Sequence, residues 1–328
     1  MNLTILRAGF LTSVQDLGRN GFRKFGVSSG GALDAHALGV ANLLVGNDES
    51  AAGLEITLGG VRLRFDDERL VAWIGGEFET HIGSSSLPAG HAAFVCGGDE
   101  IKIDRPKIGC RAWLAISGGV DVPIVLEGRS TDLRASFGGF NGRALSDGDE
   151  IPLGRNFELS KRLIEKLRDQ KIAGWKPPND WSSPAHHEPV LRFVRGAHWN
   201  RFNDSSIQRF TNETFDVSSE SDRMGVRLEG PQLNRNDDVD LISEAVAQGT
   251  IQVPPGGKPI LLLGDCQTIG GYPKIAHVIT VDLPIAAQLR GGDRVRFREV
   301  ALADAHRLLA ERHHHLEQFR IGLETHFS

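Results

Sequence analysis

The chain has 328 residues, of which 40% are hydrophobic and 24% charged, and its formal net charge is −5. This composition is typical of globular proteins and excludes a disordered chain or a continuous coiled coil. A net negative charge does not favour binding to nucleic acid or to an anionic membrane, which needs a basic surface. No run of 18 apolar residues predicts a membrane span. From the length we expect about two domains.

Glycine is the compositional outlier, because 39 residues are about 12% of the chain against an average of ~7%. The glycines separate short apolar runs, which indicates many strands joined by turns. LEITLGGVRLRF at 54–65 predicts two strands about a Gly-Gly turn, since VRLRF alternates apolar and charged residues. The Gly-Asp stretches at 97–103, 147–153 and 291–297 each predict a turn that opens a strand.

Helices are expected at only three places. Apolar residues at helical spacing predict a helix over 33–45, which the following Gly46-Asn47 can end. Residues 158–170 predict a highly charged amphipathic helix, and residues 301–319 predict a third helix.

Four prolines in GWKPPNDWSSPAHHEP, residues 174–189, favour a linker between two lobes. We therefore expect the four parts that follow: an N-terminal β-rich lobe at 1–175, a Pro-rich linker at 176–189, a C-terminal β-barrel lobe at 190–300 and a helical tail at 301–328.

Several nucleotide and metal motifs are missing from the sequence. It contains no GxxxxGK[ST] loop for ATP, no dinucleotide-binding glycine motif, no CxxC and no HExxH. His313, His314 and His315 are consecutive and point about 100° apart on a helix, so we expect no metal site there. Three cysteines are too few for a disulfide framework, and residues 1–9 lack a secretory apolar stretch, so we expect a cytoplasmic setting.

The first candidate functional stretch is LTSVQDLGRNGFRKFGV, residues 11–27. Gln15, Asp16 and Arg19 lie close together there beside glycines. An arginine fork suits a carboxylate or a phosphate, and an aspartate can orient it or act as a base. The alternative is a structural Arg–Asp pair that holds a loop.

Two further stretches follow in the second half. In SESDRMGVRLEG, residues 219–230, Ser221 and Arg223 suggest an anion site, although Ser-Asp before Arg is also ordinary turn chemistry. From Glu244 to Phe297, polar residues interrupt apolar strands beside Gly270-Gly271, which is typical of a small-molecule site at a barrel mouth. The alternative there is a polar turn with buried hydrogen bonds.

Five motifs in order resemble one family. They are VQDLGR at 14–19, GALDAHALGVANLLVGN at 31–47, SDRMGVRLEGP at 221–231, GTIQVPPGGKPI at 249–260 and QTIGGYPKIAHVITVDLP at 267–284. The family is that of the C subunit of 5-oxoprolinase, also called allophanate hydrolase subunit 2 or biotin-dependent carboxyltransferase. Its relatives include the carboxyltransferase domain of urea carboxylase and the bacterial antagonist of a sporulation-kinase inhibitor. The resemblance covers residues 3 to 298, nearly the whole chain.

The resemblance implies a mainly β fold of two cyclophilin-like β-barrel lobes with a few peripheral helices. It implies an ATP-hydrolysing 5-oxoprolinase complex with subunits A and B, which cleaves 5-oxo-L-proline to L-glutamate while another subunit holds ATP. One alternative is a biotin-dependent carboxyltransferase acting on urea or a similar amide, with biotin as cofactor. A second is a non-enzymatic regulator that binds a subunit-B-like kinase inhibitor. Ser28, Gly30 and Glu127 depart from the family pattern.

These considerations assign roles to particular side chains. Asp16 or Asp265 suits a general base that activates water, and Tyr272 and Lys274 suit the stabilisation of an oxyanion. The residues expected to bind a small amide or lactam substrate are Gln15, Arg19, Asp34, Ser221, Arg223, Gln252, Gln267, Thr268, Gly270 and Gly271. We expect the segments VQDLGR, SDRMG and QTIGGYPK to converge on one pocket.

Overall fold

The computed structural model describes residues 1–182, 188–237, 239 and 241–326. The chain forms two compact units, of which the first comprises Met1–Arg19, Gly30–Ala185 and His315–Ser328, and the second comprises Asn20–Ser29 and His186–His314. The short segment from Asn20 to Ser29 thus groups with the second half of the chain. Part of the expected linker, residues 183–187, lies outside the described residues.

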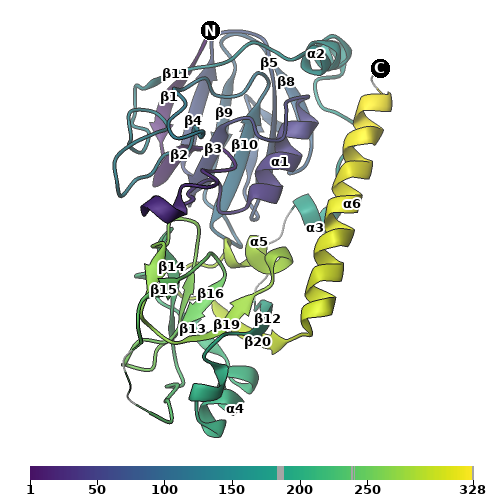
Figure 1. Cartoon of the computed structure of the whole chain (residues 1–328). Helices are drawn as coiled ribbons and strands as arrows, with labels where there is room; N and C mark the ends of the chain where they lie inside the picture. The colour runs from purple at the N-terminus through teal and green to yellow at the C-terminus, as the bar shows by residue number, and fades with distance from the viewer. Residues whose placement is uncertain (183–187, 238, 240, 327–328) are drawn as a thin grey trace. The chain divides into compact units, whose positions relative to one another are not determined.

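Two antiparallel sheets build the first unit (Figure 1). The six-stranded sheet has the order β11 (Glu150–Pro152), β1 (Asn2–Ala8), β4 (Val61–Phe65), β9 (Glu100–Ile103), β6 (Thr80–Ile82) and β7 (Ser85–Ser86). The five-stranded sheet has the order β2 (Leu11–Gln15), β3 (Gly53–Thr57), β10 (Arg111–Ile116), β5 (Arg69–Gly75) and β8 (Ala92–Val95). The strands expected about Gly59-Gly60 are β3 and β4.

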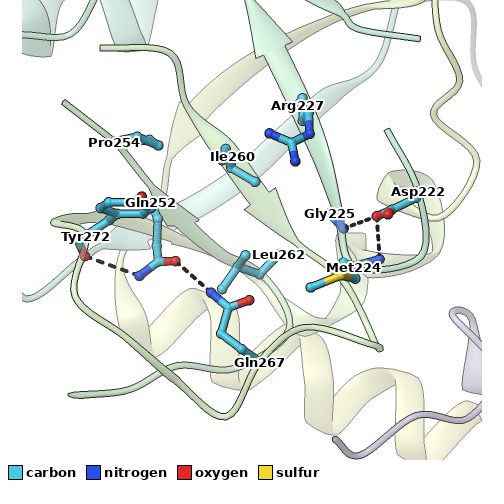
Figure 2. Close-up of a pocket in the computed structure, with 10 residues that line it drawn as sticks. All are labelled: Asp222, Met224, Gly225, Arg227, Gln252, Pro254, Ile260, Leu262, Gln267 and Tyr272. Atoms are coloured by element: carbon cyan, nitrogen blue, oxygen red, sulfur yellow. Dashed lines mark hydrogen bonds between the residues drawn. The ribbon is translucent and has the colours of Figure 1, made fainter. Parts of the chain in front are cut away.

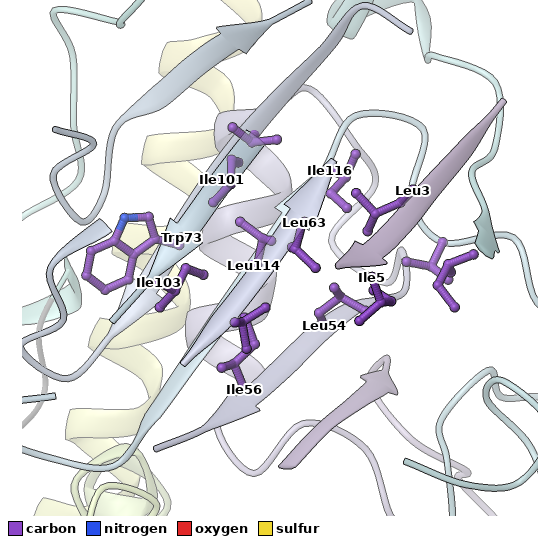
Figure 3. Close-up of a cluster of buried hydrophobic side chains, with 14 of the residues drawn as sticks. Leu3, Ile5, Leu54, Ile56, Leu63, Trp73, Ile101, Ile103, Leu114 and Ile116 are labelled. Carbon is purple, nitrogen blue, oxygen red and sulfur yellow. The ribbon is translucent and has the colours of Figure 1, made fainter. Parts of the chain in front are cut away.

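Side chains from both sheets share one apolar core (Figure 3). In β4, Val61, Leu63 and Phe65 are buried while Arg62 and Arg64 are exposed, so one face of this strand points to the core and the other to solvent. Strands β3, β5 and β10 are buried along their whole lengths, because helix α1 (Ala35–Leu44) covers the outer face of their sheet.

The three expected helices are confirmed, with small differences at their ends. Helix α2 is Glu158–Gln170, as expected, and α6 extends to Leu302–His326. A further short helix, α3 (Asn179–Ser182), and a 3-10 turn, η1 (Arg23–Phe25), were not expected. Within the described ranges, none of the helices has the length and hydropathy needed to cross a bilayer.

A closed seven-stranded barrel forms the second unit. Its order is β12 (Val190–Arg195), β19 (Lys274–Val278), β16 (Thr250–Gln252), β17 (Ile260–Leu262), β14 (Gly225–Glu229), β13 (Phe215–Val217) and β20 (Arg294–Glu299). The pair β12–β20 is parallel and closes the barrel. The Gly-Asp stretches at 97–103, 147–153 and 291–297 lead into β9, β11 and β20, which confirms those three predictions. The mainly β fold class with few helices is likewise confirmed.

A cluster of aromatic rings joins helix α4 to the barrel. Phe210 of helix α4 (Asp204–Asn212) stacks on Phe297 of β20 with ring centroids 4.7 Å apart, and it also contacts Phe193 and Phe215. The remaining short elements are η2 (Trp199–Arg201), β15 (Glu244–Ala245), β18 (Ile269–Gly270), η3 (Thr280–Asp282) and α5 (Leu283–Ala286). Strands β15 and β18 pair with each other in a separate two-stranded sheet.

Asp34 caps helix α1, so we expect Asp34→Ala to lower the free energy of unfolding by about 1 kcal/mol. Its side chain accepts a hydrogen bond from the N–H of Ala37 at 2.8 Å, and alanine would leave that buried donor without a partner. Asp34→Asn is the matched control, because asparagine caps helices equally well. Urea unfolding measures both variants, and an equal loss in both would contradict the capping role.

Candidate functional site

A pocket of about 380 Å³ opens in the second unit, beside the two-stranded sheet β15–β18 (Figure 2). Its polar lining consists of Asp222, Arg227, Gln252, Gln267 and Tyr272. Its apolar lining consists of Met224, Pro254, Ile260 and Leu262, with Gly225. A concave site with an apolar wall and a few convergent polar groups is the usual form of a small-molecule site.

One side of the pocket is shaped by an aspartate turn. Asp222 Oδ1 accepts hydrogen bonds from the N–H groups of Met224, at 2.7 Å, and Gly225, at 3.2 Å. Such a side chain reproduces a backbone turn and starts strand β14. Ser221 Oγ accepts from the N–H of Arg227 at 3.0 Å, so this predicted site residue supports the strand and does not line the pocket.

Two glutamine side chains meet at the other side. Gln267 Nε2 donates to Gln252 Oε1 at 3.3 Å, and Gln252 Nε2 donates to the backbone carbonyl of Tyr272 at 3.2 Å. Gln252 is buried, whereas Gln267 is half-buried. The side-chain carbonyl oxygen of Gln267 has no partner among the described residues, so it is available to a ligand. At Gly270 a Cβ would lie 2.7 Å from Gln252 Nε2, so a larger residue there would displace the Gln252 carboxamide.

Arg227 is the cation of the pocket and was not singled out from the sequence. It lies on the solvent face of β14, between the inward-facing Val226 and Leu228, and opposite Ile260 in the register. It makes no ion pair among the residues that the structure describes. The alternation of VRLEG beside the Ser-Asp turn was the sequence signal that could have placed it.

Behind the pocket, Arg223 and Asp265 pair with each other. Arg223 Nε donates to Asp265 Oδ2 at 2.8 Å and Nη2 donates to Oδ1 at 3.1 Å, with both side chains at least nine-tenths buried. The backbone N–H of Asp265 also donates to the carbonyl of Arg223 at 3.1 Å. The structure therefore brings these two predicted site residues together, and it directs each at the other.

Lys274 lies in a second charged group beside the pocket. It is opposite Gln252 in the β16–β19 register, and its Nζ donates to Glu244 Oε2 at 2.7 Å. This hydrogen bond and the lysine charge lower the pKa of Glu244. Burial, and then the charge of Lys274, lower the pKa values of His198 and His277.

The remaining predicted residues of the second unit belong to the turn beside the pocket. Gly270 pairs with Glu244 across β15–β18, and the carbonyl of Thr268 accepts from the N–H of Val246 at 3.1 Å. Gly271 follows β18 and leads to Tyr272, whose side chain is 46% exposed and so accessible to a ligand.

Arg23, which sequence reasoning passed over, holds this turn from the segment Asn20–Ser29. Its Nη2 donates to the backbone carbonyls of Val246 and, at 3.3 Å, Gln267. Cys266 is buried beside it, and burial raises the pKa of its thiol, as for a cysteine that packs as a small apolar residue.

In the first unit, Gln15 and Asp16 hold the segment around residue 130. Asp16 Oδ1 accepts from Ser130 Oγ and, at 2.8 Å, from the N–H of Gly18, while Oδ2 accepts from the N–H of Arg129. Gln15 Nε2 donates to the carbonyl of Thr131 at 3.2 Å. The Asp16 carboxylate thus has several donors already, which is the arrangement of a loop anchor.

Arg19 is fully buried in the same unit. Its Nε donates to the carbonyl of Val125 at 3.0 Å, Nη2 donates to that of Ser130, and the guanidinium lies 4.5 Å from the ring centre of Phe137. These contacts favour the structural alternative for this stretch. Gln15, Asp16, Arg19 and Asp34 belong to the first unit and the other predicted residues to the second, so the convergence of all three segments stays a prediction.

Comparisons with known proteins agree on one family. Residues 25–299 match the family described as carboxyltransferase domain, subdomain A and B. A protein of Escherichia coli (strain K12) named as the C subunit of 5-oxoprolinase is 38% identical over 316 residues, which cover 96% of this chain and 97% of that protein. One of the same name from Haemophilus influenzae is 34% identical over 97% of both chains.

A solved structure adds a second relationship. The crystal structure of the Kluyveromyces lactis urea carboxylase superposes with a TM-score of 0.88 at 28% sequence identity. The match covers 97% of this chain but 29% of that longer protein, so the present chain corresponds to one part of it.

Gly138 lies against the Arg19 anchor, so we expect Gly138→Ala to destabilise the first unit strongly. A Cβ there would lie 2.2 Å from Arg19 Nη2 and 2.3 Å from the carbonyl oxygen of Ser130. Gly83→Ala is the matched control, because Gly83 also has a positive φ but has no atom within 4 Å of a Cβ. We expect Gly138→Ala to lose about 2 kcal/mol more than the control in urea unfolding. Equal losses would contradict the packing argument.

His277 predicts a pH dependence of stability. Its pKa is lowered in the folded protein, so the unfolded chain takes up the proton first as pH falls below about 6.5. Stability should therefore decrease between pH 7.5 and pH 5.5. His277→Gln should make this decrease shallower in thermal unfolding, whereas the exposed control His306→Gln should not. An unchanged slope in His277→Gln would contradict the prediction.

Proposed function

The chain belongs to the carboxyltransferase domain family of subdomains A and B, and on that premise we propose that it acts as the C subunit of a 5-oxoprolinase complex. The observation that carries the proposal is similarity at 34–38% identity over nearly the full length of two relatives with that name. The proposed reaction is ATP-dependent cleavage of 5-oxo-L-proline to L-glutamate.

The reaction opens an unstrained cyclic amide, whose carbonyl carbon is a poor electrophile. Phosphorylation of the amide oxygen by ATP releases ADP and makes that carbon electrophilic. One water then adds to the carbon and the ring C–N bond breaks, and a second water releases the phosphoryl group as inorganic phosphate. The sequence contains no P-loop, so we assign ATP to another subunit of the complex and propose subunits A and B as partners. The three cysteines are free thiols, in keeping with the proposed cytoplasmic setting.

We assign the substrate to the pocket at Gln252 and Gln267. A lactam presents a carbonyl acceptor and an N–H donor on one edge, and a carboxamide side chain offers the complementary pair. The side-chain carbonyl oxygen of Gln267, described above, suits the lactam N–H. The Arg227 guanidinium suits the substrate carboxylate, and the apolar wall at Ile260 and Leu262 suits the ring methylenes.

Of the other predicted residues, one contacts the substrate in this proposal and the others hold the pocket in its shape. Tyr272 lines the pocket and its exposed phenol can donate to the carbonyl oxygen that gains charge. Lys274 is bound to Glu244, and Arg223 and Asp265 are bound to each other, so we propose these as positioning residues. The Arg223–Asp265 pair fixes the turn that carries Asp222 and Met224.

Carboxyl transfer from carboxybiotin is the second candidate function, and the similarity to the urea carboxylase structure favours it. The ureido ring of biotin is also a planar cyclic amide, so the same glutamine pair suits it. Under this alternative biotin is the cofactor and urea or a similar amide accepts the carboxyl group.

Gln267→Ala in the complex should lower glutamate release from 5-oxoproline by about 10²-fold, because a polar contact to the reacting amide is lost. The chain is co-expressed with its subunits A and B, and glutamate and ADP are measured together. The matched control is Gln232→Ala, which changes a glutamine outside the pocket. Wild-type turnover in Gln267→Ala would contradict the assignment of the substrate to this pocket.

The same preparations separate the alternatives. The 5-oxoprolinase proposal expects glutamate and ADP only when all subunits are present, and no ADP from the isolated chain. Consumption of carboxybiotin with urea as acceptor, without glutamate release, would favour carboxyl transfer. A stable complex with neither activity would favour a regulatory binding protein.

A further inference from the structure

Arg23 has no role in the proposed reaction, although it lies in the candidate stretch 11–27. Its segment, Asn20–Ser29, groups with the second unit. Arg23 begins the 3-10 turn η1, and its carbonyl accepts from the N–H of Gly26 at 3.0 Å. Gly26 has a φ of 84°, which suits glycine, so the turn closes without strain. The backbone that carries the arginine side chain is therefore fixed locally.

The guanidinium of Arg23 binds the two segments of backbone that meet beside the pocket. Its Nη2 donates to the carbonyl of Val246, which follows β15, and at 3.3 Å to that of Gln267, which precedes β18. Its Nη1 donates to Ser29 Oγ at 3.4 Å. These partners are neutral, so the guanidinium is used as a planar fork between carbonyls.

The turn at residues 266–268 is also bound from Val246. The N–H of Val246 donates to the carbonyl of Thr268 at 3.1 Å, and its side chain packs with Cys266 and Leu262. A hydrogen bond and the charge of Arg23 partly offset the burial that raises the pKa of the Cys266 thiol, so the guanidinium lies beside this cluster. The turn is thus held both by Arg23 and by Val246.

Gln267 is the side chain that this turn presents to the pocket (Figure 2). Its Nε2 donates to Gln252 Oε1 at 3.3 Å, and its side-chain carbonyl oxygen is the group assigned to the lactam N–H. Arg23 binds the backbone carbonyl of the same residue, so it fixes the peptide plane from which the side chain extends. A displacement of about 1 Å in a reacting geometry costs about 10²-fold in rate, so this plane matters to turnover.

We infer that Arg23 is a positioning residue of the pocket, whose guanidinium holds the turn at 266–268 so that the Gln267 carboxamide faces the substrate. The inference rests on the proposed function for the identity of the substrate, whereas the hold on the turn does not depend on it. Arg23 itself does not line the pocket, so it acts through Gln267 and not by contact with the substrate.

Hydrogen exchange of the full chain, read by mass spectrometry, tests the hold on the turn. Arg23→Met removes the fork, so the amide of Val246 should exchange about tenfold faster, while unchanged protection of β3 and β10 shows that the variant is folded. The matched control is Arg209→Met, because Arg209 is also half-buried and its Nη1 donates to the carbonyl of Gln232 at 3.3 Å. Unchanged exchange at Val246 in Arg23→Met would overturn the inference.

A double-mutant cycle on glutamate release by the complex tests the route through Gln267. Arg23→Met should lower turnover about tenfold, and it should add nothing in a Gln267→Ala chain, because the side chain that it positions is then gone. Arg23→Lys keeps the charge but loses the planar fork, so its turnover should stay closer to that of Arg23→Met than to wild type. Additive losses in the cycle, or full turnover in Arg23→Lys, would overturn the inference.

Failure of the proposed function gives a different result. Wild-type turnover in Gln267→Ala would contradict the proposed function, and faster exchange at Val246 would still support Arg23 as the residue that holds this turn. Wild-type turnover in Arg23→Met, in a complex that Gln267→Ala impairs, would overturn the inference and leave the proposed function intact.

Discussion

The buried ion pair between Arg223 and Asp265 is the constraint on which the second unit's pocket depends. It connects the turn before β14 to the end of β17, residues that are 42 positions apart in the chain. Two backbone hydrogen bonds run beside it, from Asp265 to Arg223 and from Leu263 to Met224. Breaking such a pair leaves an uncompensated charge in the interior, at a cost of about 3–5 kcal/mol. The pocket wall at Met224 is therefore held rigidly.

Buried and exposed polar residues around the pocket have different roles. The fully buried polar residues, Gln252 and Arg223 among them, satisfy one another or the backbone, so they set geometry. The exposed and half-buried ones, Gln267, Arg227 and Tyr272, retain hydrogen-bonding capacity toward solvent. A ligand gains from groups that are positioned but not yet satisfied. In the first unit, Asp16 accepts hydrogen bonds from the N–H groups of Gly18 and Arg129, and Arg19 donates to the carbonyls of Val125 and Ser130.

The charge of the second unit's pocket follows from its residues. The pocket of the second unit presents an arginine beside two carboxamides, which suits an anionic amide.

The sequence by itself determined the local secondary structure and which types of polar residue stand at the pocket. Alternation in VRLRF and the Gly-Asp turns predicted strands, and helical spacing predicted α1, α2 and α6, because these signals depend on neighbours within a few residues. The sequence analysis missed α4, a short helix of nine residues. It selected Gln252, Gln267 and Tyr272, which do line one pocket.

Only the tertiary structure decided how those side chains are used. Arg223 and Asp265 were both expected at a substrate site, and the structure pairs them with each other. Arg23 reaches Val246 across 223 positions of sequence. Arg227 lines the pocket because its strand, β14, pairs with β17. Such roles depend on barrel closure and strand register, which bring distant segments together and leave no periodic signal along the chain.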